Sequence, residues 1–277
     1  MEYVKLGNTG MEVSKLCLGC MGFGEPERGR EKWSIGEAES REVIKKALDS
    51  GINFFDTANL YSAGSSEEIV GKALKDFANR DEIVLASKLY FPMFDGPNAK
   101  GLSRKSIFAE IDHSLKRLQT DYLDLYIIHR WDYGTPIEET MEALHDLVKM
   151  GKVRYIGASS MHAWQFAKAQ FIAEKNGWTK FVSMQNLYNL LYREEEREMI
   201  PLLQDRKVAM TPWSPLAGGR LTRDIGAVTA RTSQAVEANL PAYIVASDNE
   251  IISRVHKLAD ERGITRGQVA TAWMLSK

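Results

Sequence analysis

Four side chains that can exchange protons stand at or just beyond the ends of apolar segments in the first half of the sequence. Asp56, Lys88 and His129 each lie near the end of such a segment, and Tyr61 follows Asp56 by five residues. A free phenol has a pKa of about 10. A neighbouring ammonium favours the phenolate, which would make Tyr61 a usable acid or base near neutral pH. Singly, these residues could be an ion pair, a packing tyrosine and a core histidine; together they predict a catalytic group.

The apolar segments that would position these residues recur at starting intervals of 27 to 39 residues. Most are apolar on both faces, as expected for parallel strands that helices cover. We expect seven strands, at residues 16–21, 53–58, 83–89, 122–129, 153–159, 181–185 and 208–213. In a barrel of parallel strands the active site lies at their carboxyl ends. The sequence therefore places Asp56, Lys88 and His129 on one side of the sheet.

Amphipathic helical patterns fill the intervals between these strands. We expect helices at residues 39–50, 65–77, 104–118, 136–150, 162–176, 194–205, 249–262 and from Thr265 onward. Ser65-Ser66-Glu67-Glu68 has the form of a capping box. The alternation predicts an α/β fold, and we favour a (β/α)8 TIM barrel. A doubly wound sheet is the alternative, but the glycines after the first strand do not match G-x-G-x-x-G. Residues 3–6 and 11–13 predict an N-terminal β-hairpin at the barrel floor.

A closed barrel needs an eighth strand, whereas we find seven before the sequence ends on a helical pattern at residues 267–277. We therefore expect strand eight and the last helix to be missing from this chain. On this interpretation residues 1–277 form a single barrel domain that is C-terminally incomplete. Residues 223–248 predict a long loop, a feature that is often functional in a compact domain.

Composition excludes several classes of function. The formal net charge is −1, so no polycationic surface for nucleic acid is expected. The first residues lack the apolar core of a signal peptide, and no apolar run approaches the roughly 20 residues of a membrane span. We expect a cytoplasmic protein without membrane or nucleic-acid partners. Cys17 and Cys20 could form a redox pair or half a zinc site, but strand geometry points them to opposite faces. We expect buried, inert cysteines and no metal.

Several motifs resemble those of the aldo-keto reductase family over essentially the whole chain, most closely its YajO-like bacterial branch. The matching motifs are Phe54-Phe55-Asp56-Thr57-Ala58-x-x-Tyr61, Ser87-Lys88, Ile127-Ile128-His129, Ile156-Gly157-Ala158-Ser159, Gln185-Asn186-x-Tyr188-Asn189 and Trp213-Ser214-Pro215-Leu216. The resemblance implies an NADPH-dependent oxidoreductase that reduces an aldehyde or ketone by hydride transfer. Tyr61 would be the general acid, Lys88 and Asp56 would tune and hold it, and His129 would orient the carbonyl.

The resemblance also implies a NADP(H) site. Its residues would be Gly19, Cys20, Met21, Asp56, Ser159, Ser160, Gln185, Trp213, Ser214, Leu216 and Gly219. Ser159, Ser160 and Gln185 would bind the carboxamide, and Trp213 would stack on the nicotinamide. The family more often has Asn at the position of Ser160, an aromatic that is usually Tyr at that of Trp213, and frequently Arg at that of Gly218. Residues 223–248 would fold over the cofactor.

Substrate contacts are expected from residues on loops at the same side of the barrel. They are Trp33, Tyr90, Arg130 and Trp131, with Phe91 beside them. The aromatic rings would shape an apolar pocket. Arg130 could instead bind an anionic group, and the YajO-like branch would suggest a sugar-phosphate substrate.

Other functions remain open on the sequence alone. A cofactor-bound regulatory subunit resembling the potassium-channel β-subunits would retain the cofactor tightly, turn over slowly and form a tetramer. An aldolase-type barrel would use Lys88 as a Schiff base, but it would have no evident use for Tyr61 and Trp213. If strand eight is missing, an inactive fragment is a further alternative, because that region carries much of the adenosine site in the family.

Overall fold

The computed structural model describes residues 1–230, 233 and 247–277 of the chain. These residues form two compact units. Unit 1 comprises Met1–Met184 and Leu202–Met210, and unit 2 comprises Gln185–Pro201 and Thr211–Lys277.

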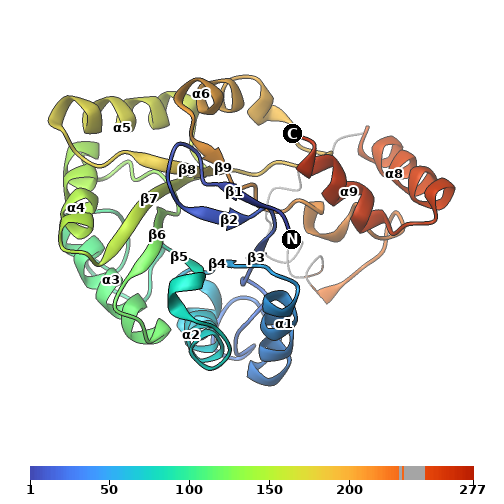
Figure 1. Cartoon of the computed structure of the whole chain (residues 1–277), viewed down its shortest axis with the longest axis horizontal. Coiled ribbons are helices and arrows are strands. Elements are labelled where there is room, and N and C mark those ends of the chain that lie inside the picture. The colour runs from blue at the N-terminus through green and yellow to red at the C-terminus, as the bar shows by residue number, and fades with distance from the viewer. Residues whose placement is uncertain (231–232, 234–246) are drawn as a thin grey trace. The chain divides into compact units, whose positions relative to one another are not determined.

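A curled parallel sheet of seven strands is the centre of the fold (Figure 1). Its order follows the sequence, from β3 through β4, β5, β6, β7 and β8 to β9. The strands are β3 (Cys17–Gly19), β4 (Phe54–Asp56), β5 (Val84–Leu89), β6 (Leu123–Ile128), β7 (Val153–Ser159), β8 (Phe181–Gln185) and β9 (Ala209–Met210). All seven predicted strands are present in the predicted order, so the (β/α)8-type fold class is confirmed. β9 is much shorter than the apolar segment suggested.

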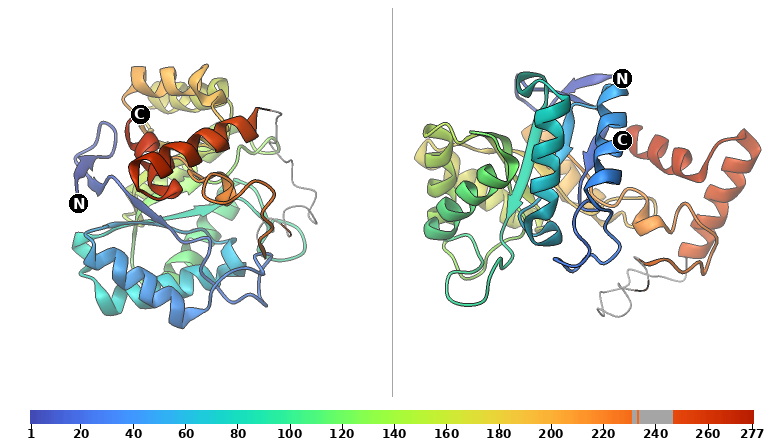
Figure 2. Two further views of the ribbon diagram at one scale, coloured as in Figure 1. Left: turned by 90° about the vertical axis from the view of Figure 1, so that its right-hand side faces the viewer. Right: turned by 90° about the horizontal axis from the view of Figure 1, so that it is seen from below.

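Helices follow the strands and pack on the outer face of the sheet (Figures 1 and 2). In unit 1 they are α1 (Glu37–Asp49), α2 (Ser65–Phe77), α3 (Arg104–Leu118), α4 (Ile137–Lys149) and α5 (Ala163–Asn176). α6 (Met199–Arg206) follows a 3-10 turn at Glu194–Glu196, so the single helix predicted at 194–205 is interrupted. Parallel strands that helices cover on one face and the barrel interior covers on the other need apolar residues on both faces. This explains the uninterrupted burial of β5.

The predicted capping box at the start of α2 is wrong. Gly64 is the N-cap residue, and no side chain caps the helix. Ser65 Oγ instead accepts from Glu25 N at 2.9 Å, and Glu68 Oε2 accepts from Arg28 Nη1 at 2.6 Å. The two side chains that would have formed the box are therefore engaged by residues 40 positions away in the sequence.

The N-terminal hairpin closes one end of the sheet interior. β1 (Tyr3–Lys5) pairs antiparallel with β2 (Glu12–Ser14). Leu6 and Val13 form one buried cluster with inward-facing residues of β4, β5 and β6, namely Phe54, Val84, Ala86, Leu125 and Ile127. Burying each large aliphatic side chain contributes about 1.5–3 kcal/mol. The prediction that the hairpin plugs the floor of the barrel is confirmed.

Unit 2 has a core of its own. α8 (Asp248–Arg262) and α9 (Arg266–Leu275) bury Ile252, Val255, Ala259, Val269 and Ala270 together with Leu221. Thr265 begins α9 in a true capping box, since its Oγ1 accepts from Gln268 N and Gln268 Oε1 accepts from Thr265 N. Of the loop predicted at residues 223–248, residues 231–232 and 234–246 lie outside the described residues.

The two cysteines differ in exposure. Cys20 is buried, as predicted, and burial raises the pKa of its thiol. Cys17 is exposed, which contradicts the expectation that both are buried. The physical reason is its place on β3, an edge strand of the sheet in the described part of the chain. Among the described helices, none is both long and apolar enough to cross a membrane.

Candidate active site

A fully buried lysine lies at the centre of the predicted catalytic group. Lys88 is the fifth residue of β5 and shares the inward face of that strand with Ala86 and Val84. Its Nζ donates to Asp56 Oδ2 at 2.5 Å, to Thr57 O at 2.8 Å and to Tyr61 OH at 3.2 Å. All three donor positions of the ammonium are therefore satisfied. The Thr57 carbonyl was not foreseen, because any residue type could supply it.

Burial and charge act in opposite directions on Lys88. Burial alone would lower the pKa of the ammonium, but Asp56 and Tyr61 outweigh it and hold the pKa above its usual value. Lys88 is therefore charged at neutral pH, and its ion pair with Asp56 is almost completely shielded from solvent.

Tyr61 titrates differently from the sequence-based expectation. Burial raises its pKa above the usual value, and the nearby Lys88 only partly reverses that effect. The argument that the ammonium brings the phenol towards neutral pH is wrong for this structure, because desolvation of the phenolate outweighs the attraction. Tyr61 therefore carries its proton at neutral pH and can act as an acid.

His129 lies beside the phenol, immediately after β6. Its backbone N donates to Leu89 O at 2.9 Å, and its ring meets that of Tyr61 edge-on at 5.8 Å between centroids. Burial, Lys88 and Arg130 lower the pKa of His129 well below its usual value, so the imidazole is neutral. In the described structure its Nδ1 is buried and has no hydrogen-bond partner. Asp56, Tyr61, Lys88 and His129 thus lie together, all within unit 1.

The residues predicted to contact the substrate divide into separate groups. Phe91 packs edge-on against His129 at 5.0 Å and against Tyr90 at 5.2 Å. The Arg130 guanidinium lies 5.6 Å from the Phe91 ring centre, and its Nη1 donates to His129 O. Tyr90, Phe91 and Arg130 therefore border the catalytic group.

The two predicted tryptophans have other neighbours. Trp131 packs against Trp164 of α5 at 6.1 Å, a partner that the sequence did not reveal. Trp33 lies beside Gly22, where an added Cβ would come within 3.5 Å of its ring.

Three predicted cofactor residues stand at the end of β3, next to the catalytic group. Gly19 is the register partner of Asp56. Cys20 N donates to Asp56 O at 2.8 Å, and Cys20 O accepts from Ser66 Oγ at 2.8 Å. Met21 follows and is half-buried. On the far side of β6, Ser159 ends β7 and is buried, and its Oγ lies 3.2 Å from Ser160 Oγ.

The remaining predicted cofactor residues belong to unit 2. Gln185 is buried at the end of β8. Trp213 N donates to Asn186 O at 3.0 Å, and Asn189 Nδ2 donates to Ser214 O. Ser214 Oγ accepts from Gly218 N at 3.0 Å, and Gly219 N donates to Leu216 O. These contacts hold residues 213–219 as one compact turn.

Comparison with known proteins identifies the family. The sequence matches the model of the aldo/keto reductase family over residues 15–277. It is 47% identical to versiconal hemiacetal acetate reductase of Aspergillus parasiticus over 297 aligned residues, which cover 100% of this chain and 86% of that protein. A candidate aryl-alcohol dehydrogenase of Schizosaccharomyces pombe is 46% identical over an alignment that covers 99% of this chain and 85% of that protein. An aldo-keto reductase of Alternaria alternata is 45% identical over an alignment that covers 98% of this chain and 80% of that protein.

Two independent observations therefore agree, since the buried acid–base group lies at the strand ends of a parallel barrel sheet and the family match spans nearly the whole chain. The chain belongs to the aldo/keto reductase family and is an oxidoreductase of the kind that reduces carbonyl groups with a nicotinamide cofactor.

Proposed function

We propose that this protein uses NADPH to reduce an aromatic aldehyde or ketone to the alcohol, with Tyr61 as the general acid. The observation that carries the proposal is the buried contact of Lys88 Nζ with both Asp56 Oδ2 and Tyr61 OH. A purely structural ion pair needs no phenol beside it. A tyrosine that donates a proton does benefit from a neighbouring cation, because the ammonium stabilises the phenolate that remains once the proton has left.

Each residue of the group then has one task. The carbonyl oxygen gains negative charge in the transition state, and Tyr61 gives it a proton. Asp56 holds Lys88 in place, and Lys88 stabilises the resulting phenolate. His129, neutral and with Nδ1 unpartnered, donates to the carbonyl oxygen from Nε2 and so fixes its direction. When bound, the nicotinamide supplies the hydride that adds to the carbonyl carbon.

The residues present suit such a cofactor. Ser159 in unit 1 offers a buried hydroxyl at the end of β7, and Gln185 in unit 2 offers a buried amide at the end of β8. Each is a side chain of the type that recognises a carboxamide. In unit 2, Ala217, Gly218 and Gly219 all have left-handed backbone conformations. An added Cβ at Gly218 would meet nothing within 4 Å, so a pyrophosphate has room to approach the backbone there. The preference for NADPH over NADH is part of the proposal.

The aromatic side chains beside His129 favour an aromatic substrate. Tyr90 and Phe91 line the approach to His129 with ring edges, and aromatic pairs of this kind prefer a further ring in an edge or offset geometry. The relative from Schizosaccharomyces pombe, named as an aryl-alcohol dehydrogenase, fits an aromatic substrate. Arg130 already contacts Phe91 and the His129 carbonyl, which makes the sugar-phosphate alternative the weaker one.

Steady-state reduction of benzaldehyde with NADPH tests the proposal. Tyr61→Phe should lower kcat by about 10²–10⁴-fold, the usual worth of a positioned acid, and should leave cofactor binding, followed by fluorescence quenching, unchanged. Tyr126→Phe is the matched control, since this tyrosine is also buried but its hydroxyl has no hydrogen-bond partner in the described structure. Full turnover by Tyr61→Phe would refute the role of the phenol. Faster turnover of a sugar-phosphate aldehyde than of benzaldehyde would refute the substrate class.

Four sequence-based expectations stay predictions alongside this proposal. They are membership of the YajO-like branch, a cytoplasmic location, a single catalytic domain over residues 1–277 and a cofactor site built from the residues named above. The regulatory alternative predicts tightly retained cofactor, slow turnover and a tetramer, so the rate of benzaldehyde reduction separates it from the enzyme.

A further inference from the structure

The backbone immediately after Tyr61 is unusual. Ser62 and Ala63 have φ of 45° and 51°, and Gly64 follows with φ of 90°. L-residues other than glycine rarely adopt this left-handed region, and consecutive ones persist only where their surroundings hold them. Because this turn directly follows Tyr61, whatever holds it also fixes the direction of the phenol.

One loop supplies the restraints on this turn. We call residues 24–31 the covering loop. Its Glu31 is buried, and Glu31 Oε2 accepts from Ser62 N at 3.2 Å. Its glycines allow close approach, because a Cβ on Gly29 would lie 2.3 Å from Ser62 Cα and one on Gly24 would lie 2.2 Å from Ser62 Cβ. The covering loop therefore lies directly on the turn.

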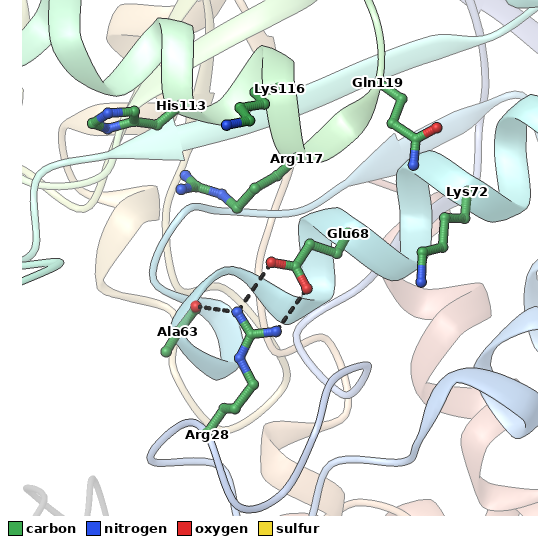
Figure 3. Close-up of a pocket in the computed structure, with 8 residues that line it drawn as sticks. All are labelled: Arg28, Ala63, Glu68, Lys72, His113, Lys116, Arg117 and Gln119. Atoms are coloured by element: carbon green, nitrogen blue, oxygen red, sulfur yellow. Dashed lines mark hydrogen bonds and ion pairs between the residues drawn. The ribbon is translucent and has the colours of Figure 1, made fainter.

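Arg28 fastens the covering loop from outside (Figure 3). Its guanidinium makes a two-pronged ion pair with Glu68 of α2, at 2.6 and 3.0 Å. Nη2 of Arg28, which makes one of these two contacts, also donates to Ala63 O at 3.3 Å. One planar side chain thus ties together the covering loop, the left-handed turn and the first turn of α2. Lysine cannot reproduce that fork.

We propose that Arg28 is a positioning residue of the reductase: with Glu68 and Glu31 it holds the turn after Tyr61 and so keeps the phenol against Lys88. The proposal rests on the function assigned to Tyr61 above. An exposed ion pair contributes little to stability. Loss of Arg28 should therefore lower kcat more than it lowers the free energy of unfolding.

Removing the guanidinium tests this directly. Arg28→Ala should lower kcat for benzaldehyde about tenfold, since a displacement of about 1 Å can cost up to a hundredfold, while KM changes less than about twofold. The solvent deuterium isotope effect on kcat should rise, because proton donation by a displaced Tyr61 becomes slower. Glu68→Gln should cause a similar loss, and adding it to Arg28→Ala should cost nothing further.

Arg41→Ala provides the matched control. Arg41 of α1 pairs with Asp76 of α2 at 2.6 Å, a comparable surface ion pair that does not touch the turn, and its loss should leave kcat and the isotope effect unchanged. Arg28 also lines a surface pocket of about 460 Å³, so added guanidinium ion at non-denaturing concentration can reach the vacated place and should restore part of the kcat of Arg28→Ala.

The two proposals fail in different ways. Equal kcat for Arg28→Ala and Arg41→Ala, or no response of Arg28→Ala to guanidinium, would overturn the positioning role while leaving the reductase intact. Absence of turnover by the unaltered chain would overturn the proposed function itself.

Discussion

The ion pair between Asp56 and Lys88 makes a sharp prediction about stability. In Asp56→Asn the carboxylate is replaced by an amide of nearly the same shape, while Lys88 stays fully buried. Breaking a buried pair by removing one partner costs about 3–5 kcal/mol, because the other charge is left uncompensated. At neutral pH we expect a loss of this size in the free energy of unfolding. For a protein of this length it corresponds to a fall in Tm on the order of 10 °C.

The pH dependence distinguishes this mechanism from a general packing defect. In the unaltered protein the pKa of Lys88 is raised, so its stabilising contribution is complete below the unfolded pKa of about 10.4 and is lost as pH rises through the folded value. In Asp56→Asn, burial becomes the dominant effect and depresses the pKa of Lys88. The unfolded chain then binds more protons, and the stability of the variant rises as pH increases towards about 10. The deficit should shrink steadily with pH.

Urea unfolding followed by tryptophan fluorescence between pH 6 and about 9.5 measures the effect, because Lys88 stays charged over this range in the unaltered protein and is expected to lose its proton in Asp56→Asn. Asp49→Asn is the control, because the Lys45–Asp49 pair is exposed on α1 with atoms 2.8 Å apart, and its loss should cost no more than about 0.5 kcal/mol. Equal stability of Asp56→Asn and the unaltered protein at pH 7, or a deficit that does not change with pH, would refute the uncompensated-charge argument.

Two further predictions concern titration and reactivity. The pKa of His129 lies well below its usual value because of burial, Lys88 and Arg130. The pH profile of kcat/KM for reduction should therefore be flat between about pH 6 and 8. A change of kcat/KM with pH in this range that His129→Gln removes would contradict the neutral imidazole. Cys17 is exposed and Cys20 is buried, so a disulfide-exchange reagent should label one thiol in the folded protein and two in urea. Cys17→Ser should abolish the label on the folded protein, and labelling that persists in this variant would show that Cys20 is accessible.

The catalytic group was predictable because its placement follows from topology. In a parallel barrel every strand delivers its last residues to the same side. Asp56, Lys88 and His129 could therefore be assigned to one side of the sheet from the periodic apolar segments alone, and the structure brings them together with Tyr61. The helix predicted at residues 39–50 was equally accessible, since its apolar residues repeat at helical spacing, and the structure has α1 there.

The features that were missed depend on partners far apart in the sequence. Glu68 looked like a capping residue from its neighbours, yet its side chain is engaged by Arg28, 40 residues away. Cys17 looked buried because it lies in an apolar segment. Such a segment predicts a strand but does not tell whether that strand lies at the edge of the sheet. The pKa of Tyr61 depends on how deeply the phenol is buried, and no local pattern encodes that depth.

The direction of each pKa shift defines one protonation pattern for the site at neutral pH. Lys88 is charged and paired with Asp56, His129 is neutral and Tyr61 holds its proton. The buried group therefore carries no net charge, which lowers the cost of enclosing it. Reduction of a carbonyl needs a protonated phenol, whereas oxidation of an alcohol needs the phenolate. Because burial keeps the proton on Tyr61, the resting site is prepared for reduction, and the same four residues would favour oxidation only at alkaline pH.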